Sequence, residues 1–207
     1  MISTFTAEQT AGRIGAAQIL PVLRTATAEE AHALALRLLS LGLTALELTA
    51  TTPGWKDVLT ALRSEAPQAL IGLGTVVTGS DAEQAFEGGA QFLVSPYPAP
   101  EVRTIAVSSD RLFIEGGFTP GELAAGTARG VAKLFPAHVG GPTYLKSMLA
   151  VLPGTRIIPT GGIPISDVPL WLDAGAFAVG VGSDLYAGGD VDATVGELLA
   201  ALPRTIR

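Results

Sequence analysis

Lys133 lies in residues 131–136, a run with the sequence VAKLFP that is apolar apart from this one charged side chain. Such a run predicts a buried β-strand. A lysine in a buried strand must bring its ammonium group out of water, which is costly, or lose its proton. An amine kept partly neutral near neutral pH is a nucleophile that condenses with a carbonyl group to form a Schiff base. The alternative is an amphipathic lysine whose stem lies along the sheet and whose end reaches solvent.

Two glycine-containing segments, TGGI at residues 160–163 and VGSD at residues 181–184, could bind an anion. Glycines let backbone N–H groups approach phosphate oxygens, and the start of a following helix adds a favourable dipole. Each segment alone is weak evidence, because turns everywhere use glycine. Together they predict a phosphate-binding site that consists of Gly161, Gly162, Gly182 and Ser183, the last adding a hydroxyl donor.

A repeat in the chain indicates which elements position these residues. Four segments combine a helical pattern, a glycine that ends the helix and a short apolar strand; the glycines are Gly42, Gly89, Gly130 and Gly175. Their nearly even spacing leaves room for further strands, predicted at residues 19–23, 70–73, 112–114 and 156–158. Eight strands alternating with helices predict an α/β protein, a single (β/α)8 TIM barrel over residues 1–207 with a short N-terminal helix. An open, doubly wound sheet is the alternative, although it seldom repeats so evenly.

Strand periodicity predicts that Glu47 and Lys133 lie on the same face of this sheet. Each is an odd number of residues beyond the glycine that precedes its strand, and strand side chains alternate between faces. The inward face is expected for both, because helices cover the outer face with apolar side chains. A carboxylate and an amine inside one barrel are costly unless they pair or work together. Such groups cluster at functional sites, with a purely structural ion pair as the alternative.

Composition limits the possible classes of protein. Hydrophobic residues make up 48% of the 207 residues and charged residues 15%, which predicts an ordered domain with a large core. A net charge of −6 without a Lys/Arg cluster argues against nucleic-acid binding. With no cysteine and only His32 and His138, neither disulfides nor a metal site are expected. Residues 1–15 lack the apolar run of a signal peptide, and Arg37 and Gly42 interrupt the apolar residues 33–46, so a cytoplasmic protein without a membrane span is expected.

Six short motifs together resemble a known enzyme family over nearly the full chain. They are PVLR at residues 21–24, LELT at 46–49, GLGTV at 72–76, KLFP at 133–136, TGG at 160–162 and VGSDLY at 181–186. The chain resembles the 2-keto-3-deoxy-6-phosphogluconate (KDPG) aldolases, and within them the 2-keto-3-deoxy-6-phosphogalactonate (KDPGal) branch. The resemblance implies a class I aldolase on a (β/α)8 barrel, without metal or cofactor, that assembles as a homotrimer.

The resemblance also implies roles for individual residues. Lys133 matches the Schiff-base lysine of the sixth strand, and Glu47 matches the catalytic glutamate of the second strand. Arg24 and Thr75 match positions near the substrate carboxylate, which an arginine can bind with two hydrogen bonds. Two further residues, Phe135 and Pro96, match apolar positions that line the pocket, although both could be plain core or turn residues.

Three residues depart from the family pattern. Thr51 stands where some members carry an arginine, so Arg24 is expected to bind the carboxylate alone. His138 stands where relatives often have glutamate or serine; it could touch substrate hydroxyls or simply be solvated. Glu115 replaces a usual proline and is expected to add a negative charge at the rim of the fifth strand.

The implied reaction cleaves a phosphorylated keto acid, a 2-keto-3-deoxy-6-phospho sugar acid, to pyruvate and glyceraldehyde 3-phosphate. The galactonate epimer is slightly favoured over the gluconate epimer by TPGW at residues 52–55 and SDLY at 183–186. The nearest alternative is a 4-hydroxy-2-oxoglutarate aldolase. A non-covalent phosphosugar isomerase or epimerase would keep the glycine loops without needing Lys133, and a non-catalytic phosphosugar-binding protein would bind ligand and turn nothing over.

Overall fold

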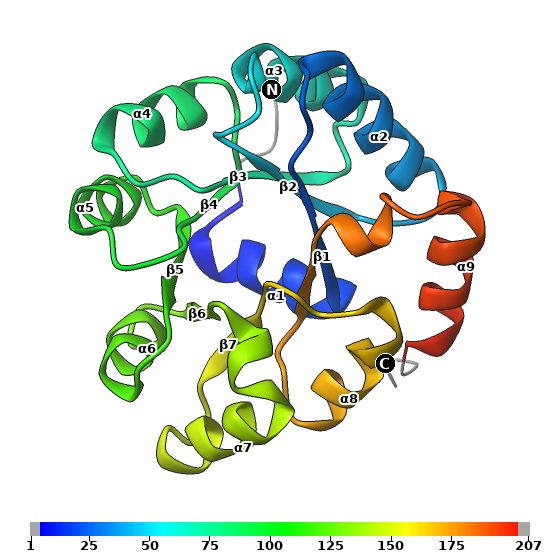
Figure 1. The fold of residues 1–207 in the computed structure, drawn as a ribbon. Coiled ribbons are helices and arrows are strands. Elements are labelled where there is room, and N and C mark those ends of the chain that lie inside the picture. The colour runs from blue at the N-terminus through cyan, green and yellow to red at the C-terminus, as the bar shows by residue number, and fades with distance from the viewer. Residues whose placement is uncertain (1–4, 203–207) are drawn as a thin grey trace.

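A computed structural model describes residues 5–202 and contains one sheet of eight parallel strands surrounded by helices (Figure 1). Neighbouring strands are consecutive in sequence from β1 to β7, and β8 pairs with β1. The strands are β1 (Ile19–Leu23), β2 (Ala45–Thr49), β3 (Leu70–Gly74), β4 (Phe92–Val94), β5 (Leu112–Gly117), β6 (Val131–Leu134), β7 (Arg156–Pro159) and β8 (Val179–Val181). All eight lie where the repeat predicts a strand.

The sheet closes into a barrel between β7 and β8. A parallel bridge joins Thr160 to Gly180, and the Phe177 N–H donates to the Ile157 carbonyl at 2.9 Å. Since β8 pairs with β1 and also bridges to the end of β7, the sheet has no open edge there and the open doubly wound alternative is wrong. The predicted (β/α)8 barrel is confirmed.

Helices alternate with the strands and form the outer ring seen in Figure 1. They are α2 (Ala28–Ser40), α3 (Trp55–Glu65), α4 (Gly79–Glu87), α5 (Pro100–Ser108), α6 (Pro120–Thr127), α7 (Gly141–Val151), α8 (Val168–Asp173) and α9 (Val191–Ala201). Three short 3-10 turns follow β6, β7 and β8: η1 (Ala137–Val139), η2 (Ile165–Asp167) and η3 (Ser183–Leu185). The four glycines of the repeat, Gly42, Gly89, Gly130 and Gly175, all have positive φ, as expected where a helix turns into the next strand.

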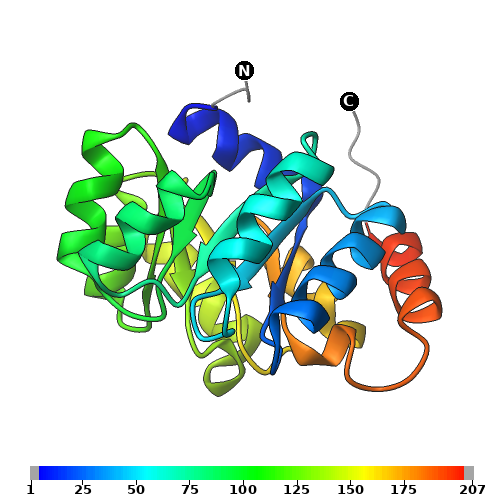
Figure 2. The same ribbon diagram turned by 90° about the horizontal axis from the view of Figure 1, so that it is seen from above.

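The short N-terminal helix α1 (Ala7–Ala17) covers the end of the barrel where the strands begin (Figure 2). It starts with a capping box between Thr6 and Gln9. Its buried residues Ala11 and Ile14 pack with side chains from the first residues of the strands, among them Leu70 and Leu112. The amino-terminal end of the barrel is therefore closed, which leaves the carboxyl end for a site.

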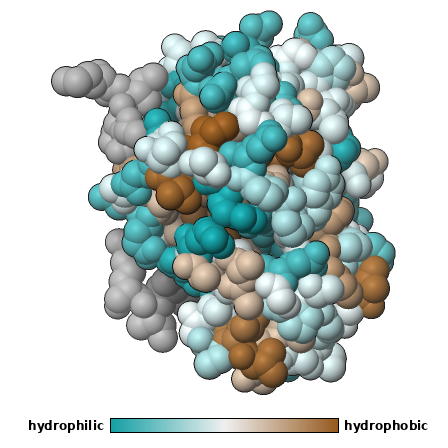
Figure 3. Space-filling view, turned by 90° about the vertical axis from the view of Figure 1, so that its left-hand side faces the viewer, coloured by the Kyte–Doolittle hydropathy of each residue, from teal (hydrophilic) through white to brown (hydrophobic). Residues whose placement is uncertain are grey.

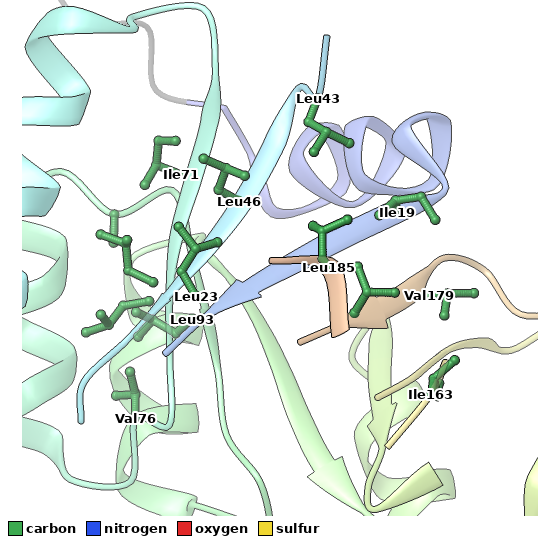
Figure 4. Close-up of a cluster of buried hydrophobic side chains, with 14 of the residues drawn as sticks. Ile19, Leu23, Leu43, Leu46, Ile71, Val76, Leu93, Ile163, Val179 and Leu185 are labelled. Carbon is green, nitrogen blue, oxygen red and sulfur yellow. The ribbon is translucent and has the colours of Figure 1, made fainter. Parts of the chain in front are cut away.

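The core has two layers. An inner layer fills the barrel beneath the site, where the Phe92 ring lies so close to Gly72 that a Cβ there would be 2.4 Å away. An outer layer lies between the strands and the ring of helices, and part of it is shown in Figure 4. Burial on both faces explains why the strands appear as apolar runs in the sequence.

The outer surface carries apolar side chains in small separate patches among hydrophilic ones, as seen on the side shown in Figure 3. Such scattered patches are ordinary for a folded domain. Within residues 5–202, no helix is long and apolar enough to cross a membrane.

Candidate active site

A cavity of about 520 Å³ opens at the carboxyl ends of the strands. Active sites of (β/α)8 barrels lie at this end. Its walls come from β1, β2 and β6 and from the segments that follow β1, β6, β7 and β8. The lining residues are Val22, Arg24, Glu47, Lys133, Phe135, Thr160, Gly161, Gly162, Ile163, Pro164, Gly182, Ser183, Asp184 and Tyr186.

Lys133 and Glu47 both point into this cavity from the inner face of the barrel. Lys133 Nζ lies 3.9 Å from Glu47 Oε1, and both side chains are buried. The predicted shared face is therefore observed. Glycine on the neighbouring strand makes room for the carboxylate, because a Cβ at Gly74 would be 1.8 Å from Glu47 Oε1.

The Glu47 carboxyl is in an environment that favours its protonated form. Burial raises the pKa of this carboxyl above its ordinary value, while the positive charges of Lys133 and Arg24 oppose part of the rise. Within residues 5–202, Glu47 Oε1 has no hydrogen-bond partner. A buried carboxyl with a raised pKa and an unbonded oxygen in a cavity can accept a proton from a bound molecule and return it.

Lys133 does not follow the alternative of a stem that reaches bulk solvent. Its residue is 6% exposed, and its amine ends inside the cavity, 5.1 Å from the centre of the Phe135 ring. The other lysines in the sequence, Lys56 and Lys146, are exposed. Lys133 is thus the one lysine whose amine is held away from solvent beside a carboxylate.

Arg24 follows β1 directly and lines the cavity on the side of Glu47. Its Nη2 donates a hydrogen bond to Thr75 Oγ1 at 3.3 Å. Thr75 follows β3 with φ 59°, a left-handed conformation that is uncommon for a β-branched residue. Such backbone strain collects at functional sites, and here it directs a hydroxyl at the guanidinium of Arg24.

The two glycine segments, which follow the neighbouring strands β7 and β8, both line the cavity. Gly161 and Gly162 have φ values of 97° and 65°, which suit glycine, and Gly182 and Ser183 begin the loop after β8. The Asp184 carboxylate accepts a hydrogen bond from the Ile165 N–H at 2.8 Å, so the loops after β7 and β8 are tied together. Gly161, Gly162, Gly182 and Ser183, the four residues of the predicted phosphate site, therefore line one cavity.

Five residues singled out in the sequence do not line the cavity: Thr51, Thr75, Pro96, Glu115 and His138. Pro96 follows β4, and its carbonyl carbon would be 2.3 Å from a Cβ at Gly116, so Pro96 packs against β5. The prediction that Pro96 lines the pocket is therefore wrong. His138 is exposed behind the glycine segment, with Nδ1 3.2 Å from the Gly161 carbonyl oxygen. Glu115 points to the outer face, where it bonds Arg103 and the Ala99 N–H, so it adds no charge to the pocket rim.

Six lining residues did not emerge as individual candidates from the sequence: Val22, Thr160, Ile163, Pro164, Asp184 and Tyr186. All of them except Pro164 are adjacent to, or share a motif with, a predicted site residue, so the motifs contained most of the signal. Within the described residues no three His, Cys, Asp or Glu side chains are grouped so that they could hold a metal ion.

A family model described as "Aldolase: KDPG and KHG aldolase" matches residues 11–195. The chain belongs to the KDPG and KHG aldolase family. It is therefore an enzyme, an aldehyde-lyase, and the resemblance inferred from its motifs is confirmed.

Relatives of this aldolase are named for either of the two substrate epimers, the galactonate or the gluconate compound. A probable 2-dehydro-3-deoxy-6-phosphogalactonate aldolase of Rhizobium meliloti is 33% identical over 83% of this chain and 82% of its own length. A 2-dehydro-3-deoxy-phosphogluconate aldolase of Zymomonas mobilis is 33% identical over 76% of each chain. The structure of a KDPG aldolase from Legionella pneumophila, with pyruvate captured as a covalent carbinolamine intermediate, matches with a TM-score of 0.82 at 30% identity, over 93% of this chain and 97% of that one.

Proposed function

We propose that this aldolase cleaves a 2-keto-3-deoxy-6-phospho sugar acid to pyruvate and glyceraldehyde 3-phosphate through a Schiff base on Lys133. The observation that carries the proposal is the pair formed by Lys133 and Glu47. A buried amine stands 3.9 Å from a carboxylate oxygen in a cavity that glycine loops also line. The captured carbinolamine named for the Legionella relative is the adduct that an amine and pyruvate form before losing water.

Lys133 supplies the electron sink. Its neutral amine attacks the C2 keto group of the substrate to give a carbinolamine, which loses water to form a protonated imine. The C3–C4 bond then breaks, and its electron pair enters the imine to leave an enamine. Protonation of the enamine at C3 and addition of one water release pyruvate and restore the free amine.

Glu47 handles the protons of these steps. As the C3–C4 bond breaks, the C4 hydroxyl must lose its proton to become the aldehyde of glyceraldehyde 3-phosphate. The Glu47 carboxylate, directly or through a water, accepts this proton. Its raised pKa, caused by burial, suits a group that must also give the proton back.

The two ends of the cavity suit the two charged ends of the substrate. Arg24, with Thr75 holding its guanidinium, binds the carboxylate next to the keto group. Backbone N–H groups at Gly161, Gly162 and Gly182, with the Ser183 hydroxyl, bind the 6-phosphate. Phe135 forms the apolar wall beside the amine.

The galactonate epimer is the favoured substrate in this proposal, because the relative with that name matches over a larger share of the chain. Pyruvate release should be measured side by side on the galactonate epimer, the gluconate epimer and 4-hydroxy-2-oxoglutarate. Higher kcat/KM on either of the other two would replace the galactonate assignment. The family resemblance also supports a cytoplasmic location and a homotrimer. Sedimentation of the purified protein would test the trimer.

Reductive trapping tests the Schiff base. Borohydride added with pyruvate should leave a stable adduct on the peptide that contains Lys133, and K133R should leave none. The exposed Lys56 and Lys146 provide internal controls in the same digest. An adduct on those two lysines alone, or isomerisation of phosphosugars without any adduct, would overturn the proposal.

A substitution at Gly182 tests the phosphate end without disturbing the fold. Among residues 5–202, no atom lies within 4 Å of a Cβ added at Gly182, so a side chain there has room. G182D should therefore place a negative charge in the cavity and raise KM sharply for the phosphorylated substrate, while pyruvate trapping on Lys133 persists. Unchanged KM, or joint loss of trapping and cleavage in a folded protein, would contradict the two-ended site.

A further inference from the structure

Tyr186 connects the two ends of the cavity through its hydroxyl group. It stands at the end of η3, in the loop that carries Gly182 and Ser183, and it lines the cavity. Its Oη accepts a hydrogen bond from the Arg24 N–H at 3.1 Å and lies 3.2 Å from the Val22 carbonyl oxygen and 3.4 Å from the Arg24 carbonyl oxygen, to which it can donate.

These bonds fix the main chain at the position where β1 ends. The pairing of β1 with β2 includes Val22 and Leu23, and Arg24 is the first residue beyond the strand. Backbone groups that leave a sheet need other partners. The Tyr186 hydroxyl provides them, at a point 162 residues away in the sequence.

The side chain of Arg24 depends on this anchor. Arg24 is an exposed residue, and its guanidinium donates a hydrogen bond to the Thr75 hydroxyl at 3.3 Å. A long flexible arm with one such contact is oriented mainly by the backbone from which it extends. Movement of the main chain at Arg24 would therefore move the guanidinium relative to Glu47 and Lys133.

We propose that Tyr186 is a positioning residue that holds Arg24 for the substrate carboxylate, so that the loop binding the phosphate also sets the keto acid end. This inference rests on the proposed function, in which Arg24 binds the carboxylate. On its other side the loop is held by the bond from Ile165 N–H to Asp184. Loss of the Tyr186 hydroxyl should therefore loosen the Arg24 side and leave the phosphate side in place.

A purely structural tyrosine is the competing explanation, because the Tyr186 ring also packs against the outer core. Y186F separates the two, since it keeps the ring and removes only the hydroxyl. Y144F is a matched control: Tyr144 Oη donates to the Phe118 carbonyl at 2.6 Å, its ring stacks on Phe118, and it lies outside the cavity.

The test measures two probes, pyruvate and inorganic phosphate, on wild type, Y186F and Y144F. In Y186F the pyruvate concentration that half-saturates borohydride trapping should rise about 3- to 10-fold, the range expected for one hydrogen bond. Inhibition of cleavage by inorganic phosphate should be unchanged, and Y144F should match wild type in both measurements. The same rise in Y144F, or equal weakening of pyruvate and phosphate in Y186F, would overturn the inference.

A double-mutant cycle then shows whether Tyr186 acts through Arg24. In the background of R24M, adding Y186F should change the half-saturating pyruvate concentration by less than about 2-fold. A full additional rise in that background would overturn the inference. Wild type that forms no pyruvate adduct would overturn the proposed function and this inference together, whereas an adduct with wild-type half-saturation in Y186F would overturn the inference alone.

Discussion

Glu47 and Glu115 are buried glutamates on opposite faces of the barrel wall, each near a cation, and they differ in how completely they are bonded. Glu115, on the outer face, accepts the Ala99 N–H at 2.8 Å and the Arg103 Nε at 2.9 Å, and also pairs with Arg103 Nη2. Glu47, on the inner face, is 3.9 Å from Lys133 Nζ, and among residues 5–202 its Oε1 has no hydrogen-bond partner. The first arrangement stabilises a fold, whereas the second leaves both groups available to a substrate.

The inner pair is Lys133 with Glu47, and the outer pair is Arg103 with Glu115. The comparison predicts that substitutions in the inner pair abolish or strongly reduce turnover without unfolding the protein. K133M should lower pyruvate release by at least about 10⁴-fold, because no other group can form the imine. The variant should stay folded, because the pKa of Glu47, which Lys133 lowers, should rise once Lys133 is lost, so that Glu47 can take up a proton and is not left as an uncompensated buried charge. Turnover assays and thermal melts of the purified variant check both parts. A K133M protein with substantial turnover would end the distinction between the two pairs.

E47Q should have the next largest effect. The amide has nearly the shape of the carboxyl group but cannot accept the C4 hydroxyl proton, so turnover should fall by roughly 10²- to 10⁴-fold. Pyruvate trapping on Lys133 should remain detectable, because the amine is still present. Turnover close to wild type would remove Glu47 from the mechanism and make the inner pair structural as well.

The outer pair should show the reverse behaviour. E115Q weakens the bonds to Arg103 and leaves that guanidinium, which is 24% exposed, without its counter-charge. The unfolding free energy should fall by roughly 1–3 kcal/mol, measured by denaturant titration. The kcat should remain within about 2-fold of wild type, because Glu115 does not line the cavity. A large loss of kcat in a stably folded E115Q would show that the outer pair also serves the site.

The smallest expected effect concerns pH. Arg24 lowers the pKa of Glu47 through its charge, against the larger rise caused by burial. In R24M the pKa of Glu47 should therefore rise further, and the carboxylate needed as base should be lost at a higher pH. The acid limb of the kcat/KM profile should move to higher pH in R24M and less in R24K, which keeps the charge. A limb that moves to lower pH would contradict this electrostatic coupling.

Local periodicity in the sequence predicted most of the fold and the inward position of Glu47, but not the outward position of Glu115. Alternation along a strand placed Glu47 and Lys133 on the inner face, because a period of two residues holds wherever the strand is regular. The expectation that Glu115 lies at the rim of β5 is wrong: Glu115 pairs with Ala132, the neighbour of Lys133, and therefore points to the face opposite to that of Lys133. Register between strands is set by the closed barrel and cannot be derived from one strand alone.

Local sequence patterns could not predict the contact of Tyr186 with Arg24 or the backbone conformation of Thr75, because both depend on the closed barrel. The bond between Tyr186 and Arg24 joins the first and last strands of the closed sheet, so its partners become neighbours only after closure. The sequence also gives no sign of the left-handed backbone at Thr75, because a threonine that follows a strand ending in glycine does not predict a positive φ. By contrast, the glycine segments were found early, because glycine itself marks an unusual backbone.

The backbone of Thr75 has a consequence for engineering this aldolase. Glycine or asparagine adopts a φ near 59° more readily than threonine, so a search for heat-resistant variants should favour replacement at this position. Each replacement would remove the hydroxyl that Arg24 contacts. Directed evolution for thermal tolerance and directed evolution for affinity toward a keto acid should therefore select different residues at position 75.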